Sequence, residues 1–141
     1  MKKVIISLLI VSVVIIAGCS SGESYTRKNF DFSQVDKVAV VDVIGYVGGE
    51  AAKNQIADIF AMQLLKKGYS PIERSQVQTI LKEQDFQASG VTPAENAAQA
   101  GKIMNVPTAV IINVPKFDEE MSITAKMINV EDGSILWMGT G

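Results

Sequence analysis

The sequence predicts an α/β domain (mixed α+β) built on a single mixed β-sheet that is covered by about three helices. Residues 38–43 and 108–114 are continuous apolar runs rich in valine and isoleucine, which is typical of buried strands. Segments with helical periodicity and capping signals lie between these runs, and a turn signal near residue 132 joins two further strand-like segments. The expected element order is therefore β-α-β-α-α-β-β-β.

The front of the chain predicts a bacterial lipoprotein signal peptide over residues 1–18, with Cys19 as the lipidated first residue of the mature protein. Two lysines precede residues 4–18, which carry no charge. At about 1.5 Å per residue this run is shorter than the roughly 30 Å hydrocarbon core of a bilayer. Gly18 is small, which gives a signal peptidase access to the bond before Cys19. The alternative is that Cys19 ends an uncleaved anchor.

Lipidation would decide the localisation of the protein. The acyl chains on Cys19 would form a durable membrane anchor, because each buried methylene contributes about 0.8 kcal/mol. Ser20 replaces the aspartate that commonly retains lipoproteins in the inner membrane, so we expect the periplasmic face of the outer membrane. In an organism with one membrane, the domain would lie outside the cell membrane.

The rest of the chain divides into a tether and one folded domain. Residues 19–35 are expected to form the lipidated N-terminus and a tether that is flexible over 20–34, and residues 36–141 the domain. Phe30 and Phe32 would dock the end of the tether on the domain, with a partner-binding role as the alternative.

The composition excludes several classes of chemistry. The chain has no histidine, which removes Ser-His-Asp and Cys-His catalytic systems and the usual zinc ligands. Its one cysteine is Cys19, so no disulfide can form within the domain. The net charge of −2 argues against nucleic acid as a partner, since phosphate contacts need clustered Lys and Arg. We therefore expect no catalytic residues, metal or cofactor.

The first half of the domain begins with a strand over 37–43 and a glycine-rich turn over 45–49. This turn lacks a complete phosphate-binding pattern. It contains the GXXG pattern of RNA-binding KH domains, but the net negative charge and the expected export of the protein argue against such a domain. An amphipathic helix is expected over 50–67, with Gly68 as the residue that ends it. Its inward residues are predicted to be Ala52, Ile56, Ile59, Phe60 and Leu64.

The second half starts with a short strand over 69–74, where Pro71 indicates a sheet edge or a strand end. A capping box from Ser75 to Gln78 predicts a helix to about residue 84 with Val77, Ile80 and Leu81 inward, followed by a loop over 85–91. A second capping box, from Thr92 to Glu95, opens an alanine-rich helix that ends near residue 104.

The chain then returns to strands. Residues 108–114 are the next strand, and residues 121–130 and 135–138 form a hairpin around a turn at 131–134. The final strand is a candidate for an exposed sheet edge. Asp118-Glu119-Glu120 is a solvated turn in this interpretation, since calcium would need more widely spaced oxygen ligands.

Three residues are candidates for protein contact. Glu73 and Arg74 would form a local ion pair or an edge contact, with a subunit contact as the alternative. Trp137 would pack on the sheet or, since it lies on the last strand, serve an interface.

These segments together resemble the CsgG superfamily. The resemblance rests on Val38–Val43, on Ile72-Glu73-Arg74-Ser75 leading into Ile80–Gln84, on Ala100–Ile103, on Ile128-Asn129-Val130, and on Asp132–Trp137. It covers roughly residues 36–138. It implies a periplasmic, lipid-anchored domain of the kind found in curli secretion lipoproteins, in activators of penicillin-binding proteins and in the N-terminal domain of TolB.

The function that the resemblance implies is non-enzymatic. The chain would be an adaptor that binds a periplasmic or envelope protein during envelope assembly or secretion. The alternative is an oligomeric subunit of a curli-type secretion channel. However, the joins at 44–49 and 115–120 are too short for the long hairpins of such a pore. The family domain usually continues with another helix after the last strand, so the chain is expected to be a truncated or minimal member.

Overall fold

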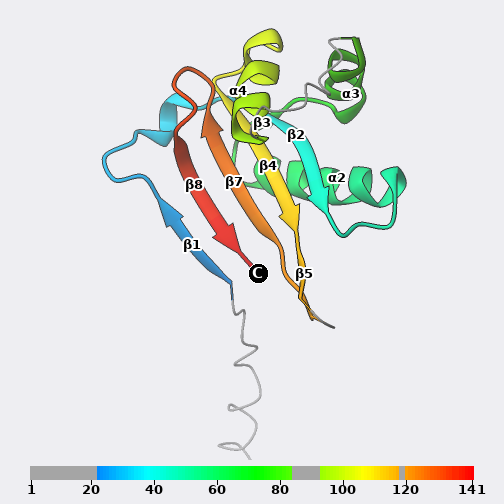
Figure 1. Ribbon diagram of the computed structural model, residues 1–141. Coiled ribbons are helices and arrows are strands. Elements are labelled where there is room, and N and C mark those ends of the chain that lie inside the picture. Colours follow the sequence, from blue (N-terminus) through cyan, green and yellow to red (C-terminus); the bar gives the residue numbers. More distant parts are fainter. Residues whose placement is uncertain (1–21, 84–92, 118–119) are drawn as a thin grey trace, which may run out of the picture.

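The computed structural model describes residues 22–83, 93–117 and 120–141, and shows one six-stranded mixed sheet with three α-helices (Figure 1). This confirms the predicted fold class. The helices are α2 (Glu50–Lys66), α3 (Arg74–Glu83) and α4 (Pro93–Ile103). The sheet strands are β1 (Glu23–Thr26), β2 (Lys37–Gly45), β3 (Ser70–Pro71), β4 (Thr108–Val114), β7 (Thr124–Asn129) and β8 (Ile135–Thr140). The short strands β5 (Lys116–Phe117) and β6 (Glu120–Met121) pair separately, and a 3-10 turn covers Phe32–Gln34.

The strand order is β1-β8-β7-β4-β2-β3, and helices cover both faces of the sheet. β2 pairs in parallel with β3 and β4, whereas the other neighbours are antiparallel. The chain moves one way along the sheet from β2 to β3 and back the other way from β3 to β4. Because such crossovers are right-handed, these two moves place α2 on one face and α3 with α4 on the other.

A β-bulge in β2 divides its side chains between the two faces. The register with β4 shifts between Val40 and Asp42. Val38, Val40 and Val43 therefore pack on the α2 face, so their spacing changes from two residues to three. Ala39 and Val41 pack on the opposite face, while Asp42 is exposed. The strand predicted over 37–43 is thus present, but it is not buried at every residue.

The core on the α2 face is only partly as predicted. Ile56, Phe60 and Leu64 pack against it and Ala57 is buried. Ile59, predicted to point inward, is instead 48% exposed. On the opposite face, Val77 of α3 is buried and Leu81 packs beside it, as expected.

The alanine-rich helix α4 packs closely on the sheet. Ala97, Ala98, Ala100 and Gly101 are buried. A Cβ atom at Gly101 would lie 2.3 Å from Cγ2 of Val130, so only glycine fits at this contact. Small side chains on this face of α4 thus let the helix approach the sheet closely.

The predicted flexible tether is wrong for the described part of residues 20–34. Glu23–Thr26 form β1, which pairs antiparallel with β8. Phe30 and Phe32 pack on the core, which confirms the prediction that they dock this segment on the domain. The two rings meet edge to face, with centroids 4.9 Å apart. The exposed edge is consequently β1 and not the final strand β8, which was the predicted candidate. At the other edge lies β3 with Pro71, as expected.

The end of α2 agrees with the sequence-based prediction, whereas the start of α3 differs from it. Gly68 has φ 92°, and the N–H groups of Gly68 and Tyr69 donate to the carbonyls of Leu65 and Leu64, which is a Schellman motif. α3 begins at Arg74, one residue before the predicted cap Ser75. The loop predicted over 85–91 and the cap at Thr92 lie outside the described residues.

Candidate functional site

A stripe of apolar side chains runs along the outer side of α2. Ile59, Met62 and Leu65 are 48%, 47% and 63% exposed. Residues three apart on a helix are neighbours, so the three side chains form one continuous strip. The inward side of α2 already packs on the sheet, so this helix is apolar on two sides.

A shallow pocket of about 300 Å³ adjoins this stripe, between α2 and the β3 edge. Met62 and Leu65 line it from the helix, and Pro71 and Ile72 line it from the sheet side. Exposed carboxylates lie on its border, from Asp58 and Glu73. We call the stripe and the pocket together the α2 surface. It is an apolar surface with a negatively charged margin.

Arg74 also lines this pocket, but its guanidinium is directed into the protein. Nη1 lies 3.0 Å from the carbonyl oxygens of both Val40 and Val41, and Nε donates to Oδ1 of Asn54 at 3.2 Å. Burial lowers the pKa of Arg74 from its ordinary value, and the nearby carboxylates, Asp42 first among them, oppose this effect. The guanidinium is thus hydrogen-bonded to the backbone of β2.

Glu73 points the other way and caps α3. Its carboxylate accepts hydrogen bonds from the N–H (2.9 Å) and the hydroxyl of Ser75. The hydroxyl bond is the main cause that lowers the pKa of Glu73. No ion pair joins Glu73 to Arg74 in the described part of the chain. Of the two predicted contact residues, therefore, only Glu73 offers an exposed charge.

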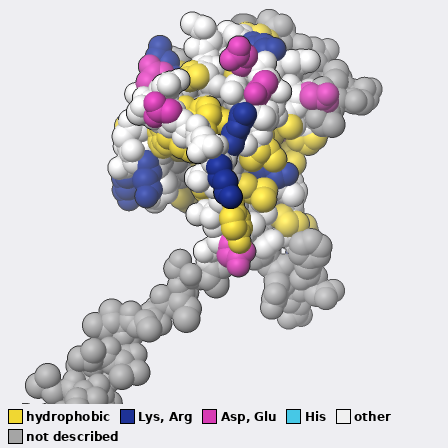
Figure 2. Space-filling view, turned by 90° about the vertical axis from the view of Figure 1, so that its left-hand side faces the viewer, with side chains coloured by type: hydrophobic (Ala, Val, Ile, Leu, Met, Phe, Trp, Pro, Cys, Tyr) yellow, Lys and Arg dark blue, Asp and Glu magenta, His cyan; other side chains and the backbone are white. Residues whose placement is uncertain are grey.

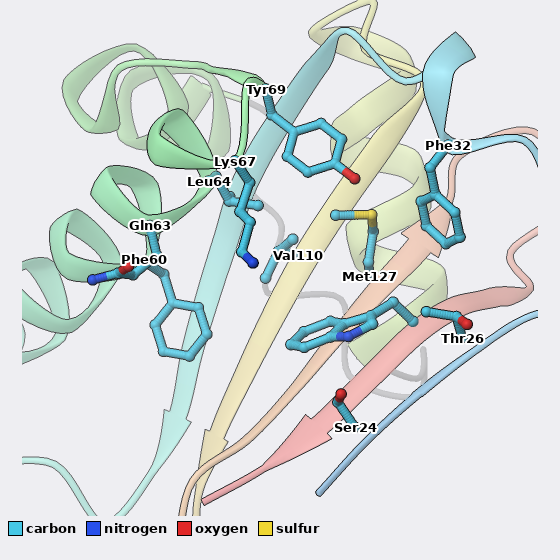
Figure 3. A pocket seen from close by; sticks show the side chains of 11 residues that line it. Ser24, Thr26, Phe32, Phe60, Gln63, Leu64, Lys67, Tyr69, Val110 and Met127 are labelled. Carbon is cyan, nitrogen blue, oxygen red and sulfur yellow. The ribbon is translucent and has the colours of Figure 1, made fainter. Parts of the chain in front are cut away.

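A second hollow of about 460 Å³ lies on the same face of the sheet, beyond α2 and next to β1. Its floor is formed by Val110, Met127 and Trp137, from three neighbouring strands. Phe60 and Leu64 of α2 form one wall (Figure 3). Because α2 covers the β2 side of this face, the strands toward β1 remain open. We call this hollow the β1 groove.

Trp137 owes its place in the groove to a neighbouring glycine. A Cβ atom at Gly139 would lie 2.6 Å from Cζ2 of the indole, so the ring lies directly over this residue. Viewed from the β1 side, the molecule shows exposed hydrophobic side chains across the middle of the visible surface, with basic side chains among them (Figure 2). The predicted contact residues Glu73 and Trp137 thus lie on two different surfaces.

Other predicted features lie outside the described residues, namely Gly18, Cys19 and the Asp118-Glu119 part of the acidic turn. Within the described ranges, no helix is long and apolar enough to span a membrane. Nor do His, Cys, Asp or Glu side chains gather there into a cluster that could hold a metal ion.

Sequence reasoning missed both surfaces. The exposed stripe leaves a signal, because Ile59, Met62 and Leu65 recur every three residues on the side of α2 away from Ile56 and Phe60. The β1 groove leaves none, because its floor combines residues from strands that are distant in sequence.

The sequence matches the family model of the curli production assembly/transport component CsgG over residues 29–128. No protein of curated function shows significant sequence similarity to this chain.

Among solved structures, the C-terminal domain of LpoB from Salmonella enterica is similar, with TM-score 0.59 and 14% identity over 75% of this chain and 80% of that one. Lipoprotein GNA1162 from Neisseria meningitidis gives TM-score 0.59 and 16% identity, again over 75% and 80%. The PelC dodecamer from Paraburkholderia phytofirmans gives 0.54 and 17%, over 85% and 78%. These likenesses confirm the fold. The family match covers most of the chain, which therefore belongs to the CsgG family.

Proposed function

We propose that this chain is a lipid-anchored protein of the bacterial envelope whose domain binds another protein and catalyses no reaction. The family is named for assembly and transport, and one of the similar structures is a lipoprotein. The observation that carries the proposal is the α2 surface. An apolar strip on the outside of a helix costs solubility unless a partner covers it, and such patches mark interaction sites.

The anchor in this proposal is Cys19, freed by cleavage after Gly18. β1 begins at Glu23, so the chain from Cys19 to the sheet can span at most about 14 Å. β1 starts at the end of the sheet where β8 finishes (Figure 1). A lipid on Cys19 would therefore hold that end of the sheet close to the membrane surface, far more tightly than a long tether would.

The partner's chemistry follows from the α2 surface. Ile59, Met62 and Leu65 require an apolar counterpart. Asp58 and Glu73 on its margin favour Lys or Arg around that counterpart. Exposed charges at a rim contribute mainly to association rate and specificity, while the buried apolar centre supplies most of the affinity. We thus assign the α2 surface to a periplasmic or envelope protein with an apolar patch bordered by basic residues.

The second candidate function is an oligomeric subunit of a secretion apparatus. It is supported by the family description and by the similar fold of PelC, which was solved as a dodecamer. In this case the α2 surface would contact another copy of the same chain.

Site-specific photocrosslinking in cells separates the two functions. A photoreactive residue at Met62 should give an adduct of one defined mass, and the same residue at exposed Gln99 of α4 should not. Leu65→Lys should remove the adduct while the unfolding transition stays unchanged. Adducts that contain only this chain would indicate the oligomeric subunit. Identical adducts from Met62 and Gln99, or none, would contradict both.

The anchor needs its own experiment. Growth with an alkyne-labelled fatty acid should label the wild type, and Cys19→Ala should abolish the label and leave the precursor uncleaved. Labelling that survives in Cys19→Ala would contradict lipidation at this residue.

A further inference from the structure

The β1 groove has the properties of a small-molecule site and is separate from the α2 surface. Its volume of about 460 Å³ lies within the usual range of ligand pockets, about 300–1,000 Å³. Large apolar side chains, including Phe60, Met127 and Trp137, form the floor and most of the α2 wall, and the polar residues Ser24, Thr26 and Gln63 also line the groove. Such a lining favours a ligand that is mostly hydrocarbon.

Two polar side chains reach into the groove from the segment where α2 finishes. The ammonium group of Lys67 and the hydroxyl of Tyr69 both point into the groove (Figure 3). Neither group has a hydrogen-bond or ion-pair partner among the described residues. An apolar pocket with a few convergent polar groups is the usual arrangement of a ligand site, because these groups fix the ligand's orientation.

The charge of the lining selects the sign of the ligand. Lys67 is the only charged side chain among the described residues that line the groove. A cationic ligand would be repelled, whereas an anion would gain an ammonium and a phenol as hydrogen-bond donors. The single positive charge of Lys67 matches the single negative charge of a carboxylate. A phosphate monoester would retain excess negative charge.

We propose that the β1 groove binds a long-chain fatty acid, with its carboxylate at Lys67 and Tyr69 and its acyl chain over Met127 and Trp137. The site depends neither on lipidation of Cys19 nor on a partner at the α2 surface. Burial of the chain predicts that affinity rises about three- to fourfold for each added methylene until the groove is filled.

The test uses the full chain in phosphatidylcholine nanodiscs and a hexadecanoate probe with a diazirine in its acyl chain. After photolysis and peptide mapping, we expect label on residues 60–69 and 124–140. Hexadecanoate should compete about tenfold better than hexadecanol, which has the same chain and no charge. Label confined to residues 4–18, or equal competition by the two compounds, would overturn the proposal.

Two lysine variants supply the matched control. Lys67→Met keeps an apolar stem and removes the charge, and it should weaken competition by hexadecanoate about tenfold. Lys66→Met, its neighbour on α2, does not line the groove and should behave as wild type. Tyr69→Phe should give a smaller loss. Equal effects of Lys67→Met and Lys66→Met would refute carboxylate recognition and with it the proposal.

Discussion

The guanidinium of Arg74 donates a hydrogen bond to the carbonyl oxygen of Val41, and the two atoms lie 3.0 Å apart. Val41 lies within the bulge of β2, where the register with β4 shifts. A bulge leaves backbone groups outside the sheet ladder, and each such group costs free energy when it is buried without a partner. Arg74, at the start of α3, thus satisfies the irregular part of the central strand from outside the sheet.

Arg74→Met should destabilise the fold by about 2–3 kcal/mol. The change removes hydrogen bonds to Val40, Val41 and Asn54, and it leaves two carbonyls of β2 without this donor. Arg74→Lys should recover little, because one ammonium cannot reproduce the planar fork of the guanidinium. Urea unfolding measures both effects. Lys82→Met, an exposed change on the same helix, should stay within about 0.5 kcal/mol of wild type. Equal stability of Arg74→Met and wild type would show that water replaces the guanidinium at the bulge.

Local patterns in the sequence predict elements well and surfaces poorly. The apolar runs at Val38–Val43 and Thr108–Val114 and the C-terminal signal at Gly68 correspond to β2, β4 and the end of α2. β1 could not be predicted, because Glu23–Thr26 is polar and exposed and is ordered by pairing with β8, more than a hundred residues later.

The candidate sites depend on the same kind of distant contact. The sequence pattern around Glu73 and Arg74 gives no indication that one side chain would cap α3 while the other reaches the bulge of β2. Trp137 is a plausible core residue from sequence. It is only half-buried, in the floor of the β1 groove, because α2 covers only one side of the sheet face.

Gly101→Ala should destabilise the protein by about 1–2 kcal/mol, although alanine is the better helix former by about 1 kcal/mol. The added Cβ would lie 2.3 Å from Cγ2 of Val130, so α4 would have to move away from the sheet. In a Val130→Ala background the clash is gone, and Gly101→Ala should then be neutral or stabilising. A double-mutant cycle from thermal or urea unfolding measures this reversal of sign. Additive effects of the two changes would contradict it.

Ser134→Ala should raise the pKa of Asp132 toward its ordinary value of 3.8. In the wild type that pKa is lowered, first by the hydroxyl of Ser134 at 2.6 Å, then by its N–H at 2.9 Å. Because the folded-state pKa is depressed, the stabilisation is present above the unfolded pKa and is lost as the pH falls through the folded value. Carbon-13 NMR titration of the Asp132 carboxyl measures the shift directly.

The same change also removes the 3.0 Å hydrogen bond that Arg27 donates to the Ser134 hydroxyl, but its pH-dependent effect on stability acts through the Asp132 carboxylate. The unfolding free energy of Ser134→Ala should therefore fall less steeply below about pH 4 than that of the wild type. Ser70→Ala, in the exposed edge strand β3, should follow the wild-type curve. An unchanged pKa in Ser134→Ala would mean that the N–H of residue 134 and the charge of Arg27 suffice to hold the pKa of Asp132 down.

Gly139→Ala should displace the indole of Trp137 and open the β1 groove further to water. The new Cβ would lie 2.6 Å from Cζ2 of the ring, too close for the ring to keep its position over β8. Trp137 is the only tryptophan in the chain, so its fluorescence reports this movement without interference. We expect a red-shifted emission and a loss of about 1–2 kcal/mol in unfolding free energy. Gly141→Ala, where a Cβ meets no atom within 4 Å, should change neither quantity. An unshifted emission in Gly139→Ala would show that β8 itself moves, and the groove would then keep its floor.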